Sequence, residues 1–269
     1  MRSWHNIIKY AALALAVIVI IGIVSAVFHA LSFIYFAFDP DITGEYTTYE
    51  FENDINALDI DIKSIDLEVN TTANPNFVVE SNYKDLTVQD KGNVLLIKDK
   101  KSFYFNIDGT AVLKLYIPQD KILDKVVINT GAGKTNLENL QAKTIDMQFG
   151  AGKTILQAIS ASENAFIEGG AGQLTIRDSR ICNLDLDMGV GKFEFSGTLL
   201  GKNVLQMGVG SSEINLTGSL DDYKLKVKKG IGDIYIGGES LENDTQLGQG
   251  DSELIFEGGV GSVSIDFSE

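Results

Sequence analysis

The second half of the chain alternates apolar and polar residues around glycine pairs of the form Gly-x-Gly. Before the pairs, apolar residues stand at every second position, as at Ile145, Met147 and Phe149. An apolar residue also stands four positions after the second glycine of each pair. These residues are Leu137, Leu156, Ile176, Phe195, Ile214, Ile236, Leu254 and Ile265. A period of two predicts short β-strands that bury one face.

The glycine pairs recur about every 19 residues, which indicates one structural unit repeated in tandem. Before each pair, the residues expected to face inward lie an odd number of positions from the second glycine, and after it they lie an even number away. The pair must therefore accommodate one extra residue, as a bulge or bend in the strand does. Glycine suits a bend because it reaches positive φ without a Cβ clash. We expect the residue between the two glycines to point into the core. The predicted bend glycines are Gly131, Gly133, Gly150, Gly152, Gly170, Gly172, Gly189, Gly191, Gly208, Gly210, Gly230, Gly232, Gly248, Gly250, Gly259 and Gly261.

One unit supplies a strand, a glycine bend, a second strand and a polar return. The prediction is therefore an all-β, single-stranded β-solenoid (β-helix-like) with coils of about 19 residues, whose stacking buries a continuous core. Residues 131–269 hold the regular coils, and residues 51–130 are predicted to form less regular coils that cap the stack. The strand at 263–267 is predicted to be an open edge.

The N-terminal residues 1–38 are predicted to be a cytoplasmic stub and a transmembrane signal-anchor helix. Residues 11–28 carry no charge and can cross the ~30 Å hydrocarbon core. Arg2 and Lys9 precede this run, which places the N-terminus in the cytoplasm and the remainder outside a single-pass cell membrane protein. A cleaved signal peptide is the alternative. Residues 39–50 are predicted to be a short linker to an ectodomain at 51–269.

Composition narrows the functional classes. The net charge is −15 and the acids lie beyond the N-terminal segment, so nucleic acid is excluded as a partner. Both histidines, His5 and His29, lie in that segment, which leaves the ectodomain without imidazole for zinc or for Ser-His-Asp catalysis. We expect no catalytic residue, no metal and no cofactor. The single cysteine, Cys182, has inward parity and is predicted to be a buried thiol.

The stretch LKLYIPQDKILDKVVINTGAGKTNLENLQAKTIDMQFGAGKTILQ resembles the bacterial adhesin-like, or toast-rack, family. The matching features are the strand at 113–118, the apolar strand that follows it, and the Gly-x-Gly coils. The resemblance covers roughly residues 51–267. It implies a β-strand-repeat domain tethered outside a bacterial membrane, in some members associated with envelope stress, and it carries no catalytic residues.

Two local motifs are explained by the repeat. The Gly-Lys-Thr sequences beginning at Gly133 and Gly152 resemble the end of a phosphate-binding loop, but the earlier glycine is missing and a strand follows instead of a helix. The Gly-Asp sequences at Asp233 and Asp251 lack the nine-residue spacing of calcium-binding coils. Scattered cation binding by paired carboxylates such as Asp185 and Asp187 stays open.

Outward positions on neighbouring coils form rows. Glu194 and Glu213 occupy equivalent positions, so stacking would hold their backbones ~4.8 Å apart, a spacing that also occurs between glycosidase carboxylates. Lys134, Lys153 and Lys192 form a second outward row that could contact acidic envelope polymers.

These observations favour a non-enzymatic, membrane-anchored extracytoplasmic β-solenoid. It would present an interaction surface to an envelope polymer or a membrane protein, adhesin-like or in envelope stress sensing. A polysaccharide-active enzyme on a β-helix scaffold is the first alternative. A structural spacer or assembly subunit is the second.

Overall fold

The computed structural model describes residues 42–51, 55–100, 111–242 and 244–268, together with Gly22 and Ser25. Apart from those two residues, the predicted transmembrane helix and its bilayer contact lie outside the described residues. Within the described part of the chain, no helix is long and apolar enough to cross a membrane. The chain divides into two compact units, Met1–Ile42 and Thr43–Glu269, and every strand belongs to the second.

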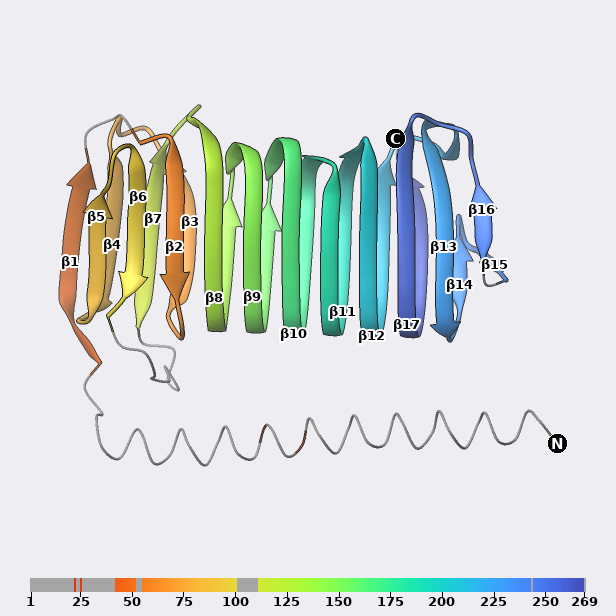
Figure 1. Ribbon diagram of the computed structural model, residues 1–269, viewed down its shortest axis with the longest axis horizontal. Coiled ribbons are helices and arrows are strands. Elements are labelled where there is room, and N and C mark those ends of the chain that lie inside the picture. Colours follow the sequence, from red (N-terminus) through yellow and green to blue (C-terminus); the bar gives the residue numbers. More distant parts are fainter. Residues whose placement is uncertain are drawn as a thin grey trace. The chain divides into compact units, whose positions relative to one another are not determined.

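The second unit is built from strands that form one continuous hydrogen-bonded sheet (Figure 1). The long strands at its centre are β8 (Ile122–Glu138), β9 (Gln141–Gln157), β10 (Ser160–Cys182), β11 (Leu184–Leu200), β12 (Lys202–Thr217) and β17 (Ser252–Ser268). The strands that precede them are β1 (Thr43–Phe51), β2 (Ala57–Ile62), β3 (Asp66–Thr72), β4 (Phe77–Tyr83), β5 (Leu86–Asp90), β6 (Val94–Asp99) and β7 (Val112–Pro118). The other end holds the 3-10 turn η1 (Leu220–Asp222), β13 (Tyr223–Ile231), β14 (Ile234–Ile236), β15 (Glu239–Leu241) and β16 (Thr245–Leu247).

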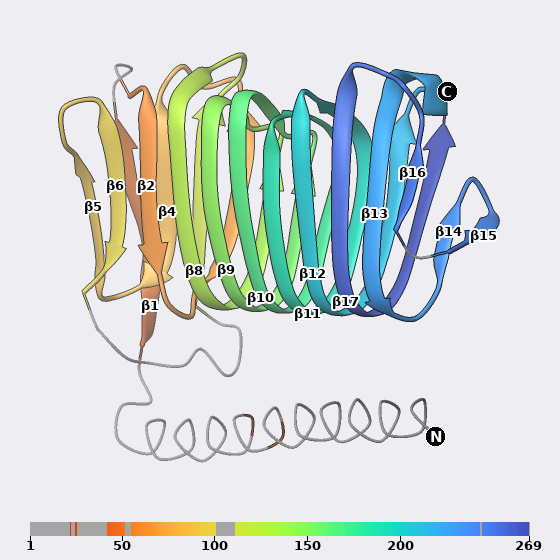
Figure 2. The same cartoon turned by 45° about the vertical axis from the view of Figure 1, so that its right-hand side comes forward.

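Each long strand bends at its glycine pair, so the sheet folds into two facing layers (Figure 2). Parallel pairing keeps equivalent residues in register, as where Gly133 pairs with Gly152 and Leu137 with Leu156. The upstream face is the layer formed by the strand halves before the glycine pairs. The downstream face is the layer formed by the halves after them. The all-β prediction is confirmed, and stacked coils in register are the arrangement of a β-solenoid.

The core lies between the two faces and follows the predicted parity. All eight apolar residues four positions after a second glycine are buried, with at most 6% of the residue surface exposed. Before the bend, Ile145 and Met147 are fully buried and Phe149 is 8% exposed. Period-two alternation therefore identified the buried face on both sides of the bend.

The residue between two glycines does not point into the core, so that prediction is wrong. Ile231 and Val260 are 41% and 38% exposed, and Ala151 and Ala171 are exposed as well. At the bend of β9 the four residues 150–153 are all exposed. The outer side of a bend has no facing sheet, so consecutive side chains there meet solvent.

The N-terminal cap departs from the predicted irregular coils at 51–130. β4 pairs antiparallel with β1 and β7, and β5 pairs antiparallel with β6, so hairpin reversals interrupt the coiling. Residues 43–50, expected to belong to the linker, form most of β1, with Glu50 opposite Val78. β1 reads TGEYTTYEF, and its threonines and tyrosines favour a strand over a linker.

The C-terminal strand β17 lies inside the stack, between β12 and the β13–β14 pair (Figure 1). Ile265 pairs with Ile214 on one side and with Ile236 on the other, so the strand at 263–267 is not the predicted open edge. The antiparallel strands β15 and β16 reverse the chain and return it beside β12. Gly248 and Gly250 lie in the loop that makes this return and not at a bend of the stack.

Candidate functional site

Seven glycine pairs lie at the bends, where both glycines meet a backbone constraint. The second glycine of each pair has a φ between +122° and +147°, which side chains rarely tolerate. A Cβ on the first glycine would lie 2.2–2.6 Å from a backbone oxygen of the neighbouring coil. The bends therefore require glycine for close coil stacking, and none of these residues carries reactive chemistry. They are Gly131, Gly133, Gly150, Gly152, Gly170, Gly172, Gly189, Gly191, Gly208, Gly210, Gly230, Gly232, Gly259 and Gly261.

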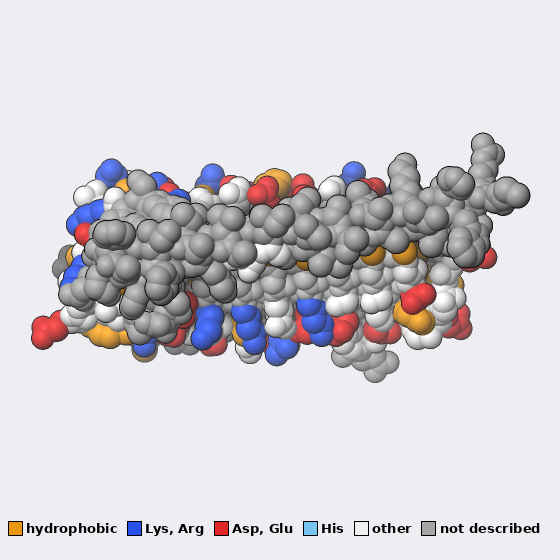
Figure 3. Space-filling model, turned by 90° about the horizontal axis from the view of Figure 1, so that it is seen from below, with side chains coloured by type: hydrophobic (Ala, Val, Ile, Leu, Met, Phe, Trp, Pro, Cys, Tyr) orange, Lys and Arg blue, Asp and Glu red, His pale blue; other side chains and the backbone are white. Residues whose placement is uncertain are grey.

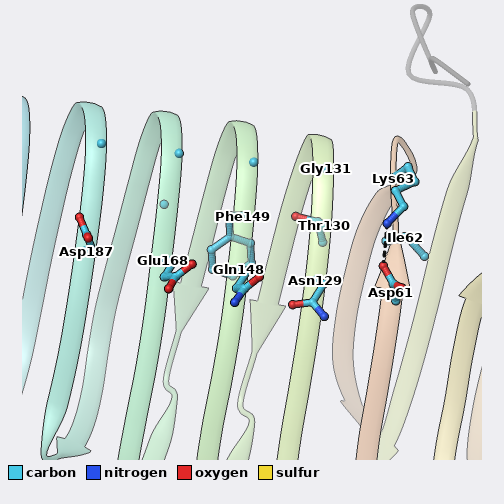
Figure 4. Close-up of a pocket in the computed structure, with 14 residues that line it drawn as sticks. Asp61, Ile62, Lys63, Asn129, Thr130, Gly131, Gln148, Phe149, Glu168 and Asp187 are labelled. Atoms are coloured by element: carbon cyan, nitrogen blue, oxygen red, sulfur yellow. Dashed lines mark hydrogen bonds and ion pairs between the residues drawn. The ribbon is translucent and has the colours of Figure 1, made fainter. Parts of the chain in front are cut away.

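A groove of about 560 Å³ runs across the upstream face beside the first glycines (Figure 4). Parallel pairing aligns one outward residue from each of five strands along it: Asp61, Asn129, Gln148, Glu168 and Asp187. The glycines leave the floor without side chains, and the aligned carboxylates and amides form a wall. We call this site the acid–amide groove.

Most of the aligned polar side chains in the acid–amide groove are carboxylates, and the others are amides. Asp61 is bound by Lys63 at 3.1 Å between Nζ and Oδ1, whereas Glu168 and Asp187 are exposed. Among the described residues no group of three or more His, Cys, Asp or Glu side chains is arranged to hold a metal ion. Charged side chains of both signs stand along the side of the molecule seen in Figure 3.

A second groove, also of about 560 Å³, crosses the downstream face over β10, β11, β12 and β17. We call it the Glu194 groove. Its polar lining residues are Arg177, Glu194, Ser196, Glu213, Asn215, Ser264 and Asp266. Glu194 pairs with Glu213 in the strand register, as the repeat predicted.

Glu194 is held as a carboxylate at the centre of this groove. Lys192 Nζ lies 2.7 Å from its Oε1, and Arg177 Nη2 and Thr175 Oγ1 each donate to its Oε2 at 3.2 Å. The hydrogen bond from Lys192, with those from Arg177 and Thr175, lowers the pKa of Glu194 against the opposing effect of partial burial. The lowered pKa disfavours Glu194 as the proton donor that glycoside hydrolysis requires.

We expect Glu194→Gln to destabilise the protein by roughly 1 kcal/mol at pH 7, as for one partly exposed charge-assisted contact. The lowered pKa means that the contribution is complete above the ordinary glutamate pKa, about 4.3, and is lost as the pH falls below it. Urea denaturation from pH 7 to pH 3 should therefore show the two proteins converging.

Glu213→Gln is the matched control, because its side chain is 60% exposed and has one ion-pair contact, with Lys192 at 3.1 Å. Its effect at pH 7 should be smaller than that of Glu194→Gln. A Glu194→Gln difference that stays constant down to pH 3 would contradict the assignment of Glu194 as a stabilised carboxylate.

A family model described as Toastrack DUF4097 matches residues 55–262, from just before β2 to just after the bend of β17. The chain belongs to this family. The resemblance found in the sequence is thereby confirmed, and it extends over nearly the whole Toastrack unit. No curated protein matches the chain.

Solved structures resemble this Toastrack chain at low identity. A putative cell adhesion protein of Clostridium sporogenes is 12% identical, with a TM-score of 0.39 over 83% of this chain and 99% of its own. A putative adhesin of Bacteroides fragilis is 12% identical, with a TM-score of 0.42 over 83% and 98%. A structure named putative lipid binding protein, from Parabacteroides distasonis, is 13% identical, with a TM-score of 0.30 over 84% and 98%. Likenesses of this degree carry no conclusion about function.

The Toastrack register also places the remaining predicted residues. Lys134 pairs with Lys153, and Gln173 joins Lys153 to Lys192, so the lysine row is present. Lys192 is engaged by Glu194 and Glu213, which raise its pKa. The strand continues through the Gly-Lys-Thr sequences of β8 and β9, and no helix follows either of them.

Cys182 is only half-buried, so its predicted burial in the core is wrong. Its neighbour Ile181 is fully buried instead. The register shifts between Ile176 and Ser179, which moves the inward parity by one residue in the second part of β10. Counting alternate positions from the glycine pair cannot reveal that register shift, because the shift lies beyond the pair within the same strand.

Proposed function

We propose that this Toastrack protein is a non-enzymatic, membrane-anchored scaffold that presents a rigid interaction surface to other molecules of the cell envelope. The observation that carries the proposal is the registration of outward side chains across successive coils, which produces two grooves that each cross at least four strands. The charge-free run at 11–28, preceded by Arg2 and Lys9, supports an anchor with the Toastrack unit outside the cytoplasm.

The surface is suited to an extended partner. Coils rise ~4.8 Å each, so equivalent side chains repeat at that interval along the grooves. The long strands are hydrogen-bonded to neighbours on both sides, which fixes the spacing before any partner binds. A surface already fixed in shape loses little conformational entropy on binding.

A polysaccharide-active enzyme is the second candidate, favoured by the stacked Glu194 and Glu213. The ion pairs that Lys192 makes with both carboxylates argue against it, because a retaining mechanism needs one of the two carboxyls to remain protonated until it donates. The third candidate, an assembly subunit joined through the strand at 263–267, loses its motivation because that strand is paired on both sides.

The test is co-sedimentation of the purified full chain with envelope fractions of the source cells, combined with an assay for new reducing ends. We expect the protein to sediment with an envelope fraction and to release no glycan fragments. Glycan hydrolysis that Glu194→Gln abolishes would favour the enzyme over the scaffold function. Absence of the protein from every envelope fraction would overturn the scaffold function. An alkaline phosphatase fused after Glu269 should be active, since that enzyme matures only outside the cytoplasm.

A further inference from the structure

An outward row of residues that crosses the Glu194 groove extends past β17 to an exposed aromatic side chain. The register places Glu194, Glu213, Ser264 and Tyr235 in one outward row over β11, β12, β17 and β14. A parallel row two residues further along the strands contains Ser196, Asn215 and Asp266. Tyr235 is 40% exposed at the end of the first row. The two rows therefore border a polar strip that ends at an aromatic ring.

We propose that this strip binds an uncharged glycan chain, laid across the coils from Arg177 to Tyr235. The inference rests on the scaffold function proposed above and names its ligand class and site. At ~4.8 Å per coil, the strip from β10 to β14 is about 19 Å long. That length accommodates several consecutive sugar rings of an extended chain.

The groove supplies both donors and acceptors, which is what sugar hydroxyls need. Asn215 offers both an amide donor and a carbonyl acceptor, and Ser196 offers a hydroxyl with the same dual capacity. The Ser264 hydroxyl donates to Asp266 Oδ2 at 2.9 Å and remains available as an acceptor. Glu213 and Asp266 add exposed acceptors. Each hydroxyl of a sugar both donates and accepts, so a mixed lining pairs with it better than a lining of one kind.

Tyr235 supplies the apolar part of the site. The C–H groups on one face of a pyranose ring carry partial positive charge and pack against the negative face of an aromatic ring. The neighbouring groove residue in the same row, Ser264, is small and leaves the tyrosine ring accessible from the groove. The acid–amide groove offers less for a sugar, because Phe149, the only aromatic among its described lining residues, is buried.

Charge selects an uncharged chain over a phosphate polymer. The carboxylates of Glu194, Glu213 and Asp266 face two cations, Arg177 and Lys192, and both cations already bind Glu194. Among the described lining residues, a polyanion would meet the exposed carboxylates of Glu213 and Asp266 and no cation that is not already paired. Sugar hydroxyls can instead donate hydrogen bonds to the same carboxylates, which act as acceptors.

The experiment is affinity electrophoresis and calorimetry of the full chain with named probes: cellotetraose, the tetramer of N-acetylglucosamine, isomaltotetraose and inorganic polyphosphate. We expect at least one uncharged probe to bind and polyphosphate not to bind. Tyr235→Ala and Asn215→Ala should each weaken binding about tenfold or more. Tyr46→Ala is the matched control, because Tyr46 is 55% exposed on β1 in the cap, and it should leave binding unchanged.

Circular dichroism and the thermal midpoint of each variant establish that the fold is retained, and Asn215→Arg, which fills the strip, provides a second blocking variant. Binding that none of these groove variants weakens would overturn the site, as would binding of polyphosphate alone or of no probe. If the protein sediments with the envelope but the groove variants change nothing, the glycan site fails and the scaffold stands. If wild-type protein does not sediment, the scaffold itself fails.

Discussion

Replacing Gly210 by alanine is expected to destabilise the protein by roughly 3–5 kcal/mol, at the upper end of single substitutions. Gly210 has a φ of +147°, and a Cβ there would lie 1.7 Å from the backbone oxygen of Gly191. The obstructing atom belongs to the hydrogen-bonded stack, so relieving the clash means moving one coil away from the next. The free energy of unfolding in urea measures the effect.

Gly237→Ala separates backbone strain from the clash. Gly237 also has a positive φ, +59°, but no atom lies within 4 Å of an added Cβ. Its loss should be limited to the cost of the left-handed conformation, about 1–2 kcal/mol. Equal losses for the two variants would contradict the argument that the glycine pairs are required by coil-to-coil contact.

Truncation after Asp251, which removes β17, is expected to unfold the C-terminal end of the stack while the central coils persist. β17 is the parallel partner of β12, β13 and β14, so all three lose one side of their hydrogen bonding. Asn203, fully buried, also loses the bond from its Nδ2 to the Glu253 carbonyl at 3.1 Å. In a stack where coils contact only their neighbours, the loss should not spread far.

Hydrogen exchange read strand by strand measures this outcome. Amides of β12–β14 should lose protection, and those of β8 and β9 should keep it. Ile265→Asp, which places a charge at a fully buried position of β17, should reproduce the local loss, and the exposed neighbouring change Asp266→Asn should not. Retained protection of β13 after truncation would mean that β13 packs on β12 directly, contrary to the observed order.

The sequence predicted the coil but not the neighbours of every coil. Parity around the glycine pairs identified inward residues such as Ile145 and Ile265, because burial of one face is a local property of each strand, and it failed at Cys182, where the register shifts. The placement of β17 could not be predicted in this way. Every coil presents the same edges, so the pattern is equally satisfied by stacking in chain order or with one coil interleaved. The antiparallel pairing of the N-terminal cap was not predicted for a related reason, because its strands show the same alternation of apolar and polar residues as the parallel coils.

The site was predictable only to the extent that it lies within the regular coils. Glu194 and Glu213 share a repeat position, so their stacking followed from the period. Ser264 reaches the groove through the insertion of β17, and with it come Asp266 and the approach to Tyr235. Arg177 stands beside Glu194 through a side-chain ion pair that no repeat position encodes.

The interleaved position of β17 has a consequence for the order of events during synthesis. The ribosome makes residues 223–236 before 252–268, so β13 and β14 emerge when their parallel partner does not yet exist. Until then the edge of β12 that later pairs with β17 also remains unpaired, and an unpaired strand edge can bind a strand of another chain. The stack can therefore be completed only after residues 252–268 have been synthesised, and the nascent chain is most exposed to mispairing before that point.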